Sequence, residues 1–175
     1  MTITFDPKHP LYTDEADVRD ELTRVYDACN GCRLCLTLCS SFPTLFSYVE
    51  QHEDQDAGRL TPAQQDQVAD ECFQCKLCYV NCPYIPEMHE SAIDFPRLML
   101  RHAAMRLENG QVSLRKRVAT QTLGHADALG VLATSVSTIS NLMIGAKPGS
   151  IARKLIEKTA GVSSVRLLPP YAKQR

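Results

Sequence analysis

The chain has 175 residues, of which 44% are hydrophobic and 22% charged, which argues for a sizeable core and against wholesale disorder. Its eight cysteines are about 4.6% of the residues, below the roughly 8–10% that marks a small disulfide scaffold. The net charge of −1 hides an asymmetry, because residues 1–96 carry 6 Lys and Arg against 17 Asp and Glu, whereas residues 97–175 carry 13 against 3. We therefore expect the two parts to contact each other, or the basic part to meet an acidic partner.

The N-terminal segment lacks the features of a secretory signal. Residues 1–10 contain Asp6, Lys8 and His9 and no apolar run, so they have neither a basic n-region nor a hydrophobic h-region. We therefore expect a cytoplasmic protein. In a reducing compartment, eight cysteines are expected to be metal ligands rather than disulfides.

Two helices are predicted in the first fifty residues. Thr13 can cap a helix over residues 14–27, and Pro43 suits the first turn of another. Their apolar stripes are Val18, Leu22 and Val25 in the first, and Leu45, Phe46 and Val49 in the second.

Two more helices are predicted before residue 111. Thr61-Pro62-Ala63-Gln64 has the pattern of a capping box with a proline in the first turn, and predicts a helix that runs into Cys72. Pro96 begins the next helix, and Asn109-Gly110 ends it. Its apolar positions are Leu98, Met99, Ala103 and Leu107. Alternating β-branched runs with hairpin turns are absent from the sequence, so the predicted fold class is all-α.

The basic part predicts three helices, Leu114 to Thr122, Ala126 to Met143 and Ile151 to Thr159. The middle one lies in a stretch of 19 uncharged residues, 128–146, which is close to the roughly 20 that span a bilayer. Six of those residues are Ser, Thr or Asn, however, so the helix is expected to be amphipathic. Its polar face is Thr134, Ser137, Thr138 and Asn141, and its apolar stripe is Leu129, Leu132, Val136, Ile139 and Met143. We expect the stripe to pack on protein, either the cysteine-containing part or a neighbouring subunit. Placement on a membrane surface is the second alternative and a span the third.

All eight cysteines lie in the acidic part, in two runs of pattern C-x2-C-x2-C-x3-C. The second run follows the first by 43 residues, the offset from Cys29 to Cys72, which indicates an internal duplication. Flanking residues agree at the same offset, namely Arg33 with Lys76, Leu34 with Leu77 and Pro43 with Pro86. The second run ends Cys82-Pro83 and completes a bacterial ferredoxin pattern, whereas the first has Ser40 at the proline position.

This pattern predicts two 4Fe-4S clusters. Three thiolates at two-residue spacing can wrap one cubane. The fourth is expected about one turn further on, on a helix that leaves the binding loop, which is too far to close the same cubane, so it reaches the other cluster. The expected ligands are Cys29, Cys32, Cys35 and Cys82 for cluster 1, and Cys72, Cys75, Cys78 and Cys39 for cluster 2. The alternatives are zinc, which needs only four ligands in two knuckles, and disulfides or free thiols. Because eight thiolates leave no open iron, the clusters are expected to transfer single electrons rather than to act on a substrate.

We expect no catalytic residue elsewhere in the chain. Neither a dinucleotide-binding nor a P-loop motif is present. The five histidines form no ligand pair at i, i+4 and are expected to be ordinary surface or core residues: His9, His52, His89, His102 and His125. The Arg115-Lys116-Arg117 triplet is expected to be a solvated helix face, with docking to an acidic partner or an anionic lipid as the alternative.

The segments CNGCRLCLTLCSSFP, CFQCKLCYVNCPYIP and IDFPRLML resemble the family of iron-sulfur subunits, designated C, of heterodisulfide reductase and of anaerobic glycerol-3-phosphate dehydrogenase. The resemblance implies an α-helical two-cluster ferredoxin domain, which we place at residues 1–110, followed by a basic helical extension at 111–175. Many relatives continue into a cysteine-rich CCG domain, whose motif this chain does not contain. The chain is thus expected to be a truncated version, a fragment, or one subunit whose partner supplies that domain.

The expected function is that of an electron-transfer subunit with no substrate site of its own. It would relay electrons between a flavoprotein dehydrogenase subunit and a CCG-type or membrane quinone-linked subunit, in the cytoplasm or at the inner face of the membrane. Peripheral membrane contact is assigned to residues 111–159. The alternatives are a free-standing soluble ferredoxin and a nucleic-acid protein with structural clusters. We do not expect a nucleic-acid partner, because Tyr171 is the one aromatic residue after Phe95 and base-stacking platforms are therefore lacking.

Overall fold

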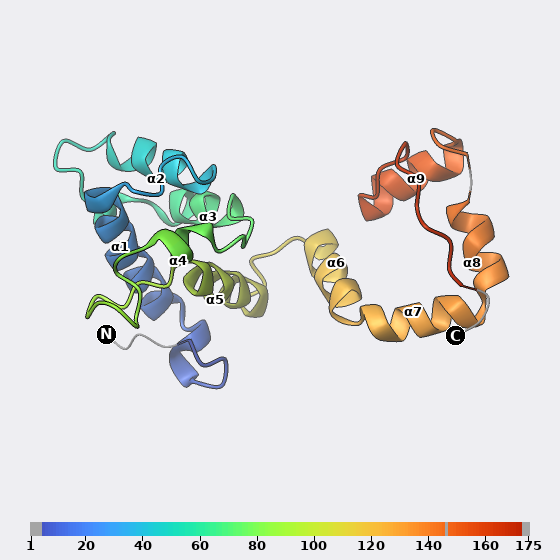
Figure 1. Ribbon diagram of the computed structural model, residues 1–175, viewed down its shortest axis with the longest axis horizontal. Helices are drawn as coiled ribbons and strands as arrows, with labels where there is room; N and C mark the ends of the chain where they lie inside the picture. The colour runs from blue at the N-terminus through green and yellow to red at the C-terminus, as the bar shows by residue number, and fades with distance from the viewer. Residues whose placement is uncertain (1–4, 146, 173–175) are drawn as a thin grey trace. The chain divides into compact units, whose positions relative to one another are not determined.

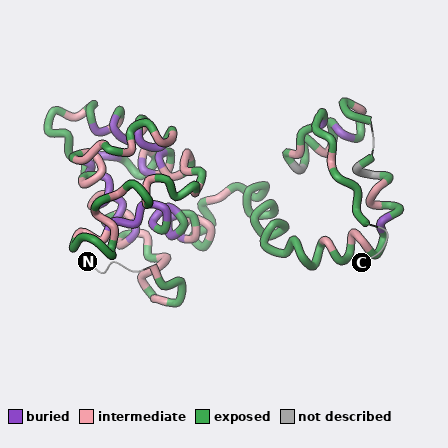
Figure 2. The backbone as a smooth tube through the Cα atoms, viewed as in Figure 1, coloured by how far each residue is buried: buried purple, intermediate pink, exposed green. Residues whose placement is uncertain are grey.

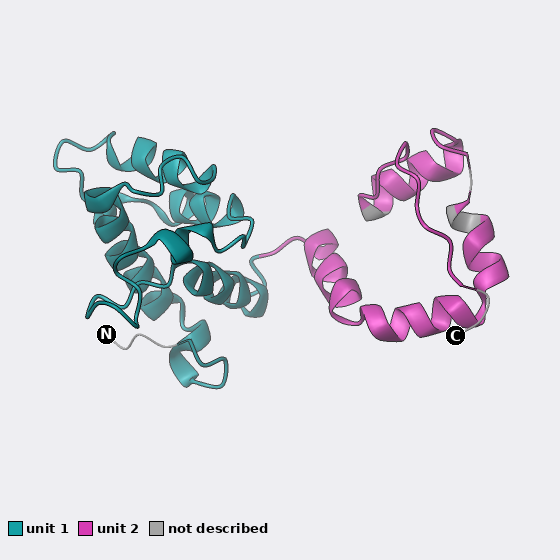
Figure 3. Ribbon diagram, in the orientation of Figure 1, with its two compact units in different colours: residues 1–111 teal, residues 112–175 magenta. Residues whose placement is uncertain are grey.

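The computed structural model describes residues 5–145 and 147–172, and these residues form helices and loops without a strand. The predicted all-α class is therefore confirmed. The chain divides into two compact units, residues 1–111 and residues 112–175 (Figure 3). The first unit contains η1 (Pro10–Thr13), α1 (Glu15–Cys32), α2 (Ser41–Val49), η2 (Ala57–Arg59), α3 (Pro62–Asp70), α4 (Leu77–Asn81) and α5 (Phe95–Glu108) (Figure 1). The second contains α6 (Leu114–Gly124), α7 (Ala126–Ser135), α8 (Ser137–Ile144) and α9 (Ile151–Ala160).

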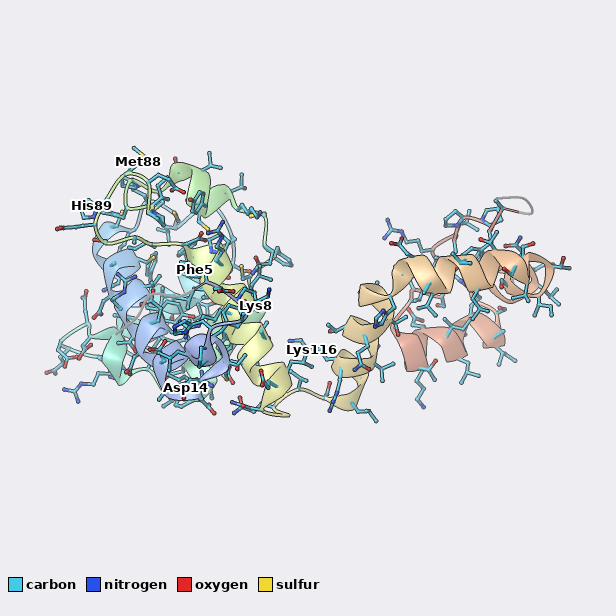
Figure 4. All side chains as sticks on the ribbon, turned by 90° about the horizontal axis from the view of Figure 1, so that it is seen from below. Phe5, Lys8, Asp14, Met88, His89 and Lys116 are labelled. Carbon is cyan, nitrogen blue, oxygen red and sulfur yellow. The ribbon has the colours of Figure 1, made fainter. Side chains whose placement is uncertain are left out.

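Helix α1 begins one residue later and ends five residues later than the sequence predicts. Thr13 belongs to η1, and the cap is Asp14, whose extended backbone lets its carboxylate accept a hydrogen bond from the Asp17 N–H at 2.9 Å (labelled Asp14 in Figure 4). The helix ends where Arg33 adopts the left-handed conformation and donates its backbone N–H to the Cys29 carbonyl. The first two cysteines therefore lie on the last helical turn.

Helix α3 begins at Pro62 as predicted, and Pro43 lies in the first turn of α2. Helix α5 begins at Phe95, one residue before the predicted Pro96, and no start was predicted for α4. The predicted capping box is present. The Thr61 hydroxyl accepts a hydrogen bond from the Gln64 backbone N–H, and the Gln64 side-chain oxygen accepts one from the Thr61 backbone N–H. Helix α3 stops at Asp70 instead of reaching Cys72, because the Cys72 N–H bonds Ala69 in a tighter turn. Helix α5 is capped by Asp94 and ends before Gly110 at φ +69°.

The core of the first unit lies between α1, α2, α3 and α5 (Figure 2). Its aromatic centre joins Phe42 of α2 to Phe95 of α5, with ring centroids 4.8 Å apart. The predicted stripes of α1 and α2 are buried, as are Leu98 and Met99 of α5. Ala103, at a predicted apolar position, is exposed, because the buried face of α5 turns toward Arg101, His102 and Met105.

Ion pairs that are partly or largely buried join the same helices. Asp66 of α3 accepts a hydrogen bond from Arg19 of α1 at 2.6 Å, and its carboxylate lies 2.8 Å from His102 Nε2 of α5. Arg101 of α5 is fully buried and pairs with Asp17 of α1 at 2.6 Å. Removing one partner from such a pair leaves the other charge without compensation, so these contacts fix the packing of the helices. The helices hold the loops that carry the cysteines.

The helices of the second unit bury no apolar side chain among those that the structure describes. The predicted middle helix is broken into α7 and α8 at Val136, whose backbone leaves the helical region at φ −112° and ψ 38°. Among the described side chains the buried residues of this unit are polar: Ser137, Arg153 and Ser164. Arg153 donates to the carbonyls of Ser163 and Arg166 and so holds the segment after α9 against that helix.

The predicted apolar stripe of this unit is exposed where it can be described. The exposed fraction is 47% for Val136 and 63% for Ile139. None of the described helices has the length and apolar character needed to cross a bilayer. Parts of three predictions lie outside the described residues: the side chain of Met143 in the stripe, Ala146 at the end of the uncharged stretch, and the ends 1–4 and 173–175 of the two domains.

Candidate metal centre

The two cysteine runs are built on different local structures. In the first run, Cys29 and Cys32 end α1, and Cys35 and Cys39 lie in the turns that follow. In the second, Cys72 and Cys75 lie in a loop after α3, Cys78 lies in α4, and Cys82 is the residue that caps the end of α4. The expected helix between the third and fourth cysteines therefore exists only in the second run. The chain of turns in the first run is a correction to the sequence-based expectation.

One backbone feature is nevertheless repeated. Arg33 and Lys76 occupy equivalent positions and both adopt the left-handed conformation, with φ of 54° and 63°. This conformation is uncommon for residues with a Cβ and reverses the chain sharply. In both runs it lies between the second and third cysteines. The duplication seen in the sequence thus extends to the backbone at the bend of each loop.

A pocket brings three cysteines of the first run together with one of the second. Cys29, Cys32 and Cys35 line it from one side and Cys82 from the other, and it encloses about 330 Å³ including space open to solvent. Its remaining wall is largely apolar, with Phe42, Phe46 and Ile93. Cys82 reaches the first run because the loop that follows it is fastened to α1, where the Arg24 side chain donates to the Ser91 carbonyl at 2.8 Å. The loop is closed by the Ile93 N–H, which donates to the Tyr84 carbonyl at 2.7 Å.

The remaining cysteines are Cys39, Cys72, Cys75 and Cys78, which we call the second group. The residues that follow Cys39 and precede Cys72 are in contact, because the Ser40 hydroxyl donates to the Glu71 carbonyl at 3.4 Å. Cys75 is the exposed member of the eight cysteines. A smaller pocket of about 240 Å³ is lined by Cys29 and Cys35 as well as by Cys78 and Cys82, so the two groups adjoin.

Burial and mutual repulsion favour the protonated form of several of these thiols in the protein alone. Burial, together with the neighbouring thiols, raises the pKa of Cys35 to about 11 and that of Cys78 to about 12. The pKa of Cys29 lies higher still, for the same reasons. Several thiolates converging at one place need compensating positive charge, which iron supplies when it binds and displaces the protons.

The donor set fits an iron-sulfur cluster. The ligands are thiols alone, they surround a cavity rather than a point, and its walls are apolar. In the described part of the chain, no three His, Cys, Asp or Glu side chains are arranged to hold a single metal ion.

Three residues near the thiols were not singled out by the sequence. The Tyr84 backbone N–H donates to Cys82 Sγ at 3.4 Å, and the Gln74 side-chain amide donates to Cys72 Sγ at 3.7 Å. Arg33 lines the first pocket, and its guanidinium is held by Glu50 at 2.5 Å. Sequence spacing does not reveal such contacts. The one available signal is at Gln74, which stands where the first run has Gly31.

An all-α unit that carries two cysteine runs of ferredoxin spacing indicates the class of electron-transfer iron-sulfur proteins. Comparison with known proteins agrees, since residues 28–85 match the family described as 4Fe-4S dicluster domain. Over 91 residues the chain is 34% identical to citrate utilization protein B of Escherichia coli, a match that covers 52% of this chain and 21% of that protein. The chain thus spans about a fifth of the length of this relative. No solved structure matches the chain.

Proposed function

We propose that the chain is the electron-transfer subunit of an oxidoreductase complex and holds two 4Fe-4S clusters. Cluster 1 is bound by Cys29, Cys32, Cys35 and Cys82, and cluster 2 by Cys39, Cys72, Cys75 and Cys78. The observation that carries the proposal is the pocket in which the last cysteine of the second run joins three of the first. The similarity of residues 28–85 to a dicluster domain supports the count of two.

The chemistry supplied by bound clusters of this kind is the uptake and release of single electrons. The chain contributes complete ligation, because four thiols at each site leave no iron position for a substrate. Phe42 and Ile93 line both pockets and exclude water from the inner sides. Since Cys29 and Cys78 line a common pocket, the two sites are close enough to exchange electrons.

We propose that the partners are a flavoprotein dehydrogenase subunit and a CCG-type or membrane quinone-linked acceptor, as in the heterodisulfide reductase and glycerol-3-phosphate dehydrogenase groups. The second unit supports a docking role, because many apolar side chains on its helices are exposed and none of the side chains described there is both apolar and buried. Residues 112–175 also carry 10 Lys and Arg against 2 Asp and Glu, which favours an acidic protein surface. Peripheral contact of residues 111–159 with an anionic membrane is the second candidate, favoured by the same charge.

Anaerobic purification of the native complex tests the proposal. The chain is expected to contain about eight irons and eight acid-labile sulfides, from two cubanes on eight thiolates, and to co-purify with a flavin-containing subunit. Two zinc ions without sulfide would refute the cluster assignment. A fully loaded chain that purifies without companions would instead favour a free-standing ferredoxin. Sedimentation with vesicles containing anionic lipid, compared with neutral vesicles, tests the membrane contact separately.

A further inference from the structure

Gln74 has a backbone conformation that its residue type does not favour. In the loop between Cys72 and Cys75 its φ is +57°, a left-handed value that strains any residue with a Cβ and that glycine adopts freely. The equivalent position in the first run is Gly31, which lies in α1 with an ordinary helical backbone. The glycine therefore stands where it is not needed, and the glutamine stands where a glycine would relieve strain. Such strain persists where the surrounding structure holds the residue in place for a purpose.

The side chain of Gln74 is directed at a ligand sulfur. Its amide nitrogen Nε2 donates to Cys72 Sγ at 3.7 Å, within the range of N–H to sulfur hydrogen bonds. The amide oxygen Oε1 is buried and has no hydrogen-bond partner, so the sulfur contact is the polar contact that fixes this amide.

The first group of cysteines has no matching side-chain donor among the described residues. Gly31 has no side chain, and the sulfur contact in that group is the backbone N–H of Tyr84 to Cys82 at 3.4 Å. Hydrogen bonds to ligand sulfurs stabilise the more negative, reduced state of a cluster and so raise its reduction potential. The two runs have the same cysteine spacing but different hydrogen bonding at sulfur.

We propose that Gln74 is a positioning residue that raises the reduction potential of the cluster bound to Cys72, so that the two clusters differ in potential. The inference rests on the proposed function, because it requires clusters at both sites. Its side-chain amide acts through the Cys72 sulfur and not on a substrate. The strained backbone of the loop is the conformation that brings this amide to that sulfur.

A redox titration of the intact chain, prepared anaerobically and followed by electron paramagnetic resonance, tests the proposal. Gln74→Met keeps the length of the side chain and removes the donor, and Gln74→Gly removes the side chain and relieves the positive φ. Gln55→Gly is the matched control, because Gln55 is an exposed glutamine with φ +49° that makes no sulfur contact. Both Gln74 variants are expected to shift one of the two reduction steps to a more negative potential and to leave the other unchanged. The control is expected to shift neither.

Iron and sulfide analysis of the same samples separates the possible failures. If the wild-type chain lacks clusters, the proposed function itself is refuted. If all variants hold both clusters and neither potential moves, the tuning role of Gln74 is refuted while the proposed function stands. If both Gln74 variants lose a cluster that the control retains, the residue serves assembly, which also overturns the tuning role.

Discussion

Replacing Cys82 by alanine gives the sharpest test of how the two runs are interlocked. Cys82 belongs to the second run by sequence, but it lines the pocket of Cys29, Cys32 and Cys35. Cys82→Ala therefore removes one of four thiolates from cluster 1 and none from cluster 2. Iron content is expected to fall from about eight to about four per chain, since a cubane holds four irons.

The position of the freed thiols distinguishes crossed ligation from ligation within each run. The variant is alkylated anaerobically with iodoacetamide, and the labelled peptides are identified by mass spectrometry. Crossed ligation predicts labelling of the peptide that contains Cys29, Cys32 and Cys35. The mirror variant, Cys39→Ala, is the control and should expose the thiols of the second run instead. Labelling confined in each case to the substituted run would refute the crossing.

Three further outcomes follow from the ion pairs, the thiols and the exposed stripe. Asp66→Asn breaks the pair with Arg19 and should lower the free energy of unfolding by about 1–3 kcal/mol at pH 7. The loss is smaller than for a fully buried pair, because the carboxylate is only partly buried. Desolvation raises the pKa of Asp66, but hydrogen bonds from Arg19 and His102 and the charges of Arg19 and Arg106 outweigh it, so the pKa lies below its usual value. The stabilisation by the Asp66 carboxylate is therefore lost as the pH falls through this pKa. The melting temperatures of wild type and variant should converge over that range. In the cluster-free chain, alkylation of Cys35 should accelerate about tenfold per pH unit between pH 7 and 9, because its pKa is about 11; a flat profile would contradict the burial of this thiol. Glu at both Val136 and Ile139 should abolish co-purification with the partner, since each buried side chain contributes ~1.5–3 kcal/mol, and an unchanged yield of complex would leave the stripe without that role.

Local signals predicted the parts of the fold that local contacts determine. The capping box at Thr61 and Gln64 needs only four consecutive residues, and the all-α class follows from apolar spacing along each helix. The break at Val136 was not predicted, because neither proline nor glycine marks it and the helix pattern continues through it. The exposure of Ala103 depends on which face of α5 packs against the neighbouring helices. The spacing of apolar residues along the helix does not determine that face.

At the candidate site, the sequence predicted the cofactor class but not the surroundings of the sulfurs. Cysteine spacing is sufficient to indicate 4Fe-4S chemistry, which the dicluster match supports. The contacts of Gln74 and Arg33 depend on a left-handed backbone at each residue, a conformation that neither residue type favours. Conformational propensities of the residue types therefore could not have predicted these contacts. The assignment of each cysteine to a cluster stays a prediction.

If Cys29 and Cys32 ligate a cluster as proposed, we expect the last turn of α1 to link the supply of iron to the lifetime of the protein. Cys29 and Cys32 lie on the same helix that places Val18 and Leu22 in the core, so ligand binding at one end of the helix stabilises the core at the other. A chain made during iron starvation lacks this contribution, opens more often and is degraded faster by proteases that act on open states. The cell would thereby clear copies of the chain that cannot carry electrons.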